Sequence, residues 1–123
     1  MKTYHTDNAP RALGPYSQAV EVKGTIYFSG QIGIDSKTGE LAGDIAMQAH
    51  QCCKNLKSII LAAGLTLKSV VKTTCFLADM KDFAIFNEVY GKYFAHKPAR
   101  SCVAVKDLPK GALCEIEAVA VRE

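Results

Sequence analysis

The sequence predicts an α+β domain, a two-layer sandwich in which a mixed six-stranded sheet carries two helices on one face. Two segments have apolar residues at helical spacing. The other apolar segments are short and rich in Val, Ile, Ala and Cys, as strands are. The chain has 123 residues, 49% of them hydrophobic and 22% charged, which suits one globular domain spanning residues 1–123.

The N-terminal part is expected to supply three strands. Residues 1–15 are rich in turn-forming residues, so we expect at most a short edge strand followed by a loop. A hairpin follows, with one strand at residues 19–22, a tight turn at residues 23–24 and a second strand at about residues 25–29. Gly30 then marks a point where the strand bends or where its backbone comes close to another group.

Two helices are expected, separated by a β-branched strand at residues 70–78. Asp44 is a good N-cap for the first helix, and Gly64 is a plausible stop. Its apolar face recurs in steps of three and four, at Ile45, Ala49, Cys52, Leu56, Ile59, Ile60 and Ala63. Asp79 is expected to cap the second helix, with Asp82 in its first turn. That helix has an aromatic stripe more typical of a core than of a cofactor site: Phe83, Phe86, Tyr90, Tyr93 and Phe94.

The last two strands, at residues 98–105 and 113–121, are expected to be neighbours joined by a turn that contains Pro109 and Gly111. Each carries a full charge in an apolar setting, Arg100 in the first strand and Glu115 in the second. One interpretation is a structural ion pair across the two strands. The other is a site in which the guanidinium grips a carboxylate and the glutamate orients or deprotonates water.

Several of the expected strands are apolar on both faces. Side chains alternate along a strand, yet both sets are largely apolar in residues 101–105 and 116–121. Two helices cover only one face of a sheet, and soluble monomers rarely expose a large apolar patch. We therefore expect the second face to be buried in a closed, symmetric homo-oligomer.

Composition argues against several classes of protein. The chain has no apolar run long enough for a membrane span and no signal peptide, and its net charge of +3 comes without a basic stripe for nucleic acid. An odd number of cysteines without a C-x-x-C motif argues against a disulfide framework and a zinc site, and favours core thiols in the cytoplasm. These cysteines are Cys52, Cys53, Cys75, Cys102 and Cys114. His5, His50 and His96 lie too far apart to suggest a metal site.

No generic catalytic motif is present. Arg100 lies on the same strand face as Cys102 and can lower the pKa of its thiol, although we favour inert packing for this cysteine. Tyr16 opens a strand and either reaches a ligand or packs at the surface. Asn87 lies in the second helix and faces either solvent or a neighbouring subunit.

Three segments resemble the reactive-intermediate deaminase A family (RidA), within the YjgF-type superfamily. They are GPYSQAV at residues 14–20, FSGQIG at residues 28–33, and PARSCVAV with LPKGALCEIEAVAV at residues 98–121. The resemblance covers essentially the whole chain. It implies a chorismate-mutase-like fold and a homotrimer in which three sheets form a central barrel, with clefts between neighbouring subunits.

The resemblance also implies an activity, the hydrolysis of reactive enamines and imines such as 2-aminoacrylate, 2-iminobutanoate and 2-iminopropanoate to 2-keto acids and ammonia, without metal or organic cofactor. It gives Arg100 the substrate carboxylate and Glu115 the water. The residues that it places in the site are Tyr16, Ser29, Gly30, Asn87, Arg100, Cys102 and Glu115. Two alternatives stay open: an RNA-directed translation inhibitor or ribonuclease, and a chaperone-like trimer that binds a keto acid without turnover.

Overall fold

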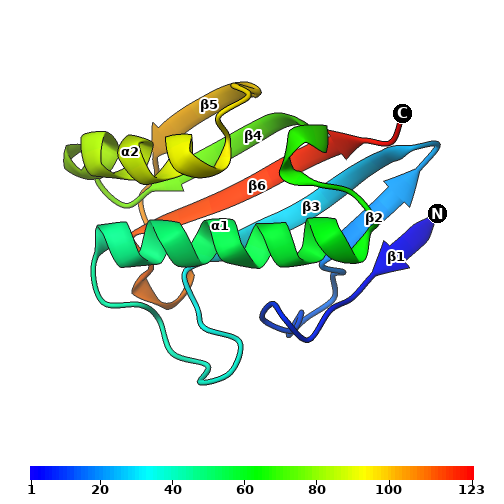
Figure 1. The fold of residues 1–123 in the computed structure, drawn as a ribbon. Coiled ribbons are helices and arrows are strands. Elements are labelled where there is room, and N and C mark those ends of the chain that lie inside the picture. The colour runs from blue at the N-terminus through cyan, green and yellow to red at the C-terminus, as the bar shows by residue number, and fades with distance from the viewer.

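The computed structural model describes residues 1–123, which form one mixed sheet with both helices on the same face (Figure 1). The strands are β1 (Lys2–Tyr4), β2 (Ala19–Val22), β3 (Thr25–Ile32), β4 (Val70–Leu77), β5 (Ala99–Ala104) and β6 (Cys114–Val121). Their order in the sheet is β1-β2-β3-β6-β4-β5, and every neighbouring pair is antiparallel except β4 and β5. The predicted two-layer α+β sandwich is confirmed.

The helices are α1 (Ile45–Ala62) and α2 (Phe83–Tyr93). Asp44 caps α1 as predicted, because its side chain accepts a hydrogen bond from the backbone N–H of Met47 at 2.8 Å. The cap predicted for α2 is wrong in detail. Asp79 accepts from the backbone N–H of Lys81 and opens a short 3₁₀ turn, so α2 itself begins only at Phe83. Neither helix combines the length and apolar composition needed to cross a membrane.

The prediction that the last two strands are neighbours is wrong. Strand β4 lies between β5 and β6, parallel to β5 and antiparallel to β6. The β4–α2–β5 segment is a crossover unit, and such units join parallel strands that are usually adjacent. The 105–113 connection must therefore pass the end of β4 before β6 begins. Strand β3 also runs further than predicted, to Ile32, with a register irregularity between Phe28 and Gln31.

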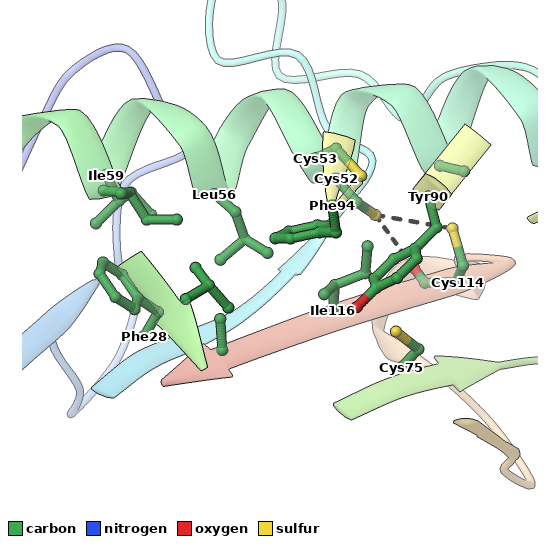
Figure 2. Close-up of a cluster of buried hydrophobic side chains, with 14 of the residues drawn as sticks. Phe28, Cys52, Cys53, Leu56, Ile59, Cys75, Tyr90, Phe94, Cys114 and Ile116 are labelled. Carbon is green, nitrogen blue, oxygen red and sulfur yellow. Dashed lines mark hydrogen bonds between the residues drawn. The ribbon is translucent and has the colours of Figure 1, made fainter. Parts of the chain in front are cut away.

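The core lies between the helices and the sheet (Figure 2). Leu56 and Ile59 of α1 and Ile116 of β6 are completely buried there. The cysteines predicted to pack in the core do so, and all five are free thiols. Four are fully buried, and the Sγ atoms of Cys52 and Cys114 lie 3.7 Å apart.

No element of the chain covers the other face of the sheet (Figure 1). Tyr27 of β3 and Val103 of β5 are 50% and 46% exposed on this face. Val119 of β6 is also partly accessible there. The uncovered face therefore exposes apolar residues, as expected from the sequence, although it also carries Glu115 and Glu117.

Candidate active site

Arg100 lies on the edge strand β5 and packs against α2. Its Nη1 donates a hydrogen bond to Oδ1 of Asn87 at 2.7 Å, and its Cζ lies 4.9 Å from the ring centroid of Tyr90 and 5.6 Å from that of Phe83. No carboxylate of the chain pairs with this guanidinium, so the structural ion pair with Glu115 is excluded. The remaining guanidinium N–H groups lack a protein acceptor.

A concavity of about 330 Å³ adjoins this guanidinium. Its lining residues are Asn87, Tyr90, Gly91, Phe94, Lys97, Pro98 and Arg100. The lining contains two cations, Lys97 and Arg100, and no acidic residue. An unpaired guanidinium beside such a pocket is suited to a carboxylate ligand, because the planar fork binds both oxygens at once.

Glu115 lies near the start of β6 and faces away from the helices. Its neighbours in sequence, Cys114 and Ile116, are fully buried in the core, so alternation directs Glu115 to the uncovered face. Burial raises the pKa of the Glu115 carboxyl above its usual value, and the negative charge of Glu117 raises it further. A raised carboxyl pKa is typical of a group that exchanges protons at neutral pH.

The absence of a side chain at Gly30 leaves space for the Glu115 side chain. A Cβ at this position would lie 2.9 Å from Cδ and 3.0 Å from Oε2 of Glu115. The glycine stands at the register irregularity of β3, opposite the start of β6. The sequence therefore places the smallest residue where the backbone must lie against the carboxylate, as expected for Gly30.

Tyr16 and Ser29 lie on the Glu115 side of the molecule. Ser29 donates its hydroxyl to the carbonyl of Ser17 and its N–H to the carbonyl of Gln18, which fixes the preceding loop against β3. Tyr16 is exposed; it lines one cavity of about 430 Å³ with Gly30 and another of about 390 Å³ with Ser29. We call Tyr16, Ser29, Gly30 and Glu115 the Glu115 half-site.

Asn87 and Cys102 belong with Arg100, and these three form the Arg100 half-site. The sequence left open whether Asn87 faces solvent or a neighbouring subunit. In the structure, its side chain instead accepts a hydrogen bond from Arg100 of its own chain. The Cys102 thiol packs against the core next to Cys75, its partner in the β4–β5 register. Burial raises the pKa of this thiol despite the opposing charge of Arg100, which favours inert packing over nucleophilic chemistry.

The two half-sites are far apart within one chain. Arg100 pairs with Thr73 of β4, and Glu115 pairs with Phe76 of the same strand. Three residues along the strands and two strand spacings put their backbones roughly 14 Å apart. Their side chains also project to opposite faces of the sheet, since Arg100 contacts α2 and Glu115 does not face the helices.

Two residues of this region were predicted only as core. Tyr90 and Phe83 contact the guanidinium as well as the core. Their spacing held a signal, because residues 83, 87 and 90 follow the i, i+4, i+7 pattern of one helix face. That pattern includes Asn87, so one face of α2 supplies all three contacts to Arg100.

A larger concavity, about 830 Å³, lies elsewhere, beside the two chain ends and the end of α1. Three of its polar side chains already bond to one another or to nearby backbone: Arg122 binds Glu21 at 3.0 Å and the carbonyl of Ala63 at 2.7 Å, and Tyr4 donates to Glu21 at 2.6 Å. This cluster ties β1, β2 and β6 to α1. No group of three or more His, Cys, Asp or Glu side chains in the chain is arranged to hold a metal ion.

Residues 6–122 match the family described as Endoribonuclease L-PSP. The chain belongs to this RidA/YjgF family. It is 50% identical to the 2-iminobutanoate/2-iminopropanoate deaminase of Escherichia coli, with 98% of each chain covered. It is also 50% identical to the mouse protein of the same name, with 98% of this chain and 91% of that protein covered. A crystal structure of Escherichia coli TdcF with bound serine matches with a TM-score of 0.97 and 43% identity over the full length of both chains. The family expected from the three sequence segments is confirmed.

Proposed function

We propose that this protein hydrolyses 2-imino acids and their enamine tautomers, such as 2-iminobutanoate, 2-iminopropanoate and 2-aminoacrylate, to 2-keto acids and ammonia. The observation that carries the proposal is the unpaired Arg100 guanidinium beside a pocket without acidic residues. The names of the relatives at about 50% identity support the same reaction. We place the reaction in the cytoplasm, in keeping with five free thiols.

The substrate itself requires the two half-sites to come from different chains. The carboxylate carbon and the imine carbon of a 2-imino acid are directly bonded, so Arg100 and Glu115 must approach within a few ångströms of one small molecule. Within one chain, the backbones of these residues are roughly 14 Å apart. A second copy that docks its Glu115 half-site against the Arg100 half-site removes the conflict. The uncovered apolar face supports such an assembly, which we propose to be a closed homotrimer with a central barrel.

In the assembled cleft, Arg100 binds both carboxylate oxygens of the substrate and thereby fixes the position of the imine carbon. The Glu115 carboxylate of the neighbouring copy takes a proton from water as the water oxygen adds to that carbon, and returns this proton to the imine nitrogen, which becomes an amine. Glu115 then takes the proton of the new hydroxyl group and passes it to the amine. The C–N bond breaks as the C=O double bond forms, so ammonia leaves and the 2-keto acid remains.

The remaining predicted residues have supporting roles in this proposal. Backbone groups at Gly30 and Cys102 hydrogen-bond the reacting nitrogen or the water, while Tyr16 and Ser29 line the cleft. Asn87 supports Arg100 through its hydrogen bond. Every step uses groups of the protein and water, so the proposal calls for no metal or organic cofactor.

The direct test is to generate 2-iminobutanoate with a threonine dehydratase, with semicarbazide competing for the imine. We expect the protein to speed formation of 2-oxobutanoate and to suppress the semicarbazone. A preparation that binds 2-oxobutanoate without accelerating hydrolysis would instead support the chaperone-like alternative. Because the family description names an endoribonuclease, RNA is incubated in parallel; RNA cleavage without imine hydrolysis would support that alternative.

Gly30→Ala is expected to lower activity while leaving the fold intact. The new Cβ overlaps the far end of the Glu115 side chain, which can move aside at little cost to stability. The displaced carboxylate no longer meets the water, and a shift of about 1 Å in a catalytic group can cost roughly 10²-fold in rate. Thermal unfolding and the imine assay together check this expectation. An active Gly30→Ala variant would argue against Glu115 as the base.

Glu117→Gln is expected to move the acid limb of the pH–rate profile to lower pH. The charge of Glu117 helps to raise the pKa of Glu115, so its removal lets Glu115 ionise at lower pH. A base must be ionised to take a proton, so activity then persists further into the acid range. The measurement is kcat/KM against pH for both proteins. A limb that stays in place or moves to higher pH would contradict the assignment.

A further inference from the structure

We propose that Tyr90 is a positioning residue for Arg100, whose ring holds the guanidinium in the orientation that receives the substrate carboxylate. The proposal rests on the function proposed above and adds a residue that otherwise counts as part of the core. Tyr90 is 7% exposed, belongs to the core cluster and also lines the pocket beside Arg100.

The contacts of Arg100 come from one face of α2. The ring centroids of Tyr90 and Phe83 lie 4.9 Å and 5.6 Å from Cζ, within the range of cation–π attraction, and Asn87 accepts from Nη1 at 2.7 Å. An arginine side chain has several rotatable bonds, so a free guanidinium would lose substantial rotamer entropy on binding a carboxylate. Two rings and one amide restrict that motion before the substrate arrives.

Tyr90 is itself held firmly. Its hydroxyl hydrogen-bonds with Oγ1 of Thr73 at 2.6 Å, and both groups are buried. Its ring stacks on Phe94 at 4.7 Å between centroids and on Phe86 at 5.9 Å, and Figure 2 shows it reaching from α2 toward the sheet beside Phe94. Thr73 is also the register partner of Arg100 in β4. Thr73 is therefore linked to Arg100 in two ways, by the pairing of their strands and through Tyr90, which contacts both residues.

A purely structural role makes a different prediction, and Tyr93 supplies the matched control. Tyr93 lies on the same helix, and its hydroxyl hydrogen-bonds His50 at 3.3 Å, but it has no contact with Arg100. Removing either tyrosine ring takes a similar aromatic group from α2. Only the loss of Tyr90 removes a ring face from the guanidinium.

The experiment compares Tyr90→Leu, Tyr90→Phe and Tyr93→Leu by calorimetric binding of 2-oxobutanoate and by the imine assay. We expect Tyr90→Leu to raise the Kd and KM by about 3- to 30-fold with kcat little changed, because the Glu115 half-site is untouched. Tyr90→Phe keeps the ring and should retain near wild-type binding. Tyr93→Leu should lower the melting temperature without changing either constant.

Equal binding by Tyr90→Leu and the wild type would overturn the inference, as would a Tyr93→Leu variant that loses binding to the same degree. If Tyr90→Leu does not fold, Phe83→Leu provides the second variant, since Phe83 is only partly buried and its ring also faces Arg100. Unchanged binding in that variant would then overturn the inference. Failure of the wild type to bind 2-oxobutanoate or to hydrolyse the imine would count against the proposed function instead.

Discussion

Replacing Arg100 with alanine is expected to lower kcat/KM for 2-iminobutanoate by roughly 10²- to 10³-fold, the usual effect of removing one partner from a desolvated charge pair. The variant loses the group that binds the substrate carboxylate, so the affinity for 2-oxobutanoate should fall together with the rate. Arg100→Lys keeps the charge but not the planar fork, and we expect it to recover only a small part of the activity.

The fold should tolerate the loss of Arg100. The side chain forms one hydrogen bond, to Asn87, and no ion pair within its own chain. Circular dichroism and the oligomeric state of Arg100→Ala should therefore match the wild type. An Arg100→Ala variant with full activity would refute the role of this residue in binding the substrate carboxylate.

Replacing Glu115 with glutamine is expected to lower kcat by roughly 10²- to 10⁴-fold, the usual contribution of a general acid–base group. Glutamine has nearly the same shape, so it fits the space that Gly30 leaves beside the carboxylate. Because Arg100 is unchanged, the Kd for 2-oxobutanoate should stay close to the wild-type value. The assays are single-turnover kinetics for the rate and calorimetry for the binding. Loss of binding with an unchanged rate would reverse the roles given to the two residues.

Much of the fold could be predicted from local sequence. Asp44 is followed by apolar residues at helical spacing, and α1 begins where the two signals meet. The hairpin of β2 and β3 turns at Lys23 and Gly24, both of which have positive φ. The partners of β5 could not be predicted in this way. Its apolar residues fit any sheet position, and the choice of β4 depends on the crossover through α2.

The candidate site could be predicted in part. The resemblance named Arg100 and Glu115, and the glycine beside the carboxylate was expected as a point of close approach. Their placement on opposite faces, with β4 between their strands, depends on strand order and register, which the residues alone did not specify. Tyr90 was interpreted only as core because a buried aromatic residue on a helix gives the same pattern whether or not a cation lies against its ring.

The central claim is that each cleft combines Arg100 of one copy with Glu115 of another, and mixed oligomers test it most directly. Arg100→Ala and Glu115→Gln, each inactive alone, are co-expressed in equal amounts with different tags and purified through both. In a closed trimer that contains both variants, one of the three clefts pairs an intact Arg100 with an intact Glu115, so the doubly purified sample should have about one third of wild-type activity. If the mixed oligomers form and remain as inactive as their parents, the two residues do not act across a subunit boundary, and the account is wrong.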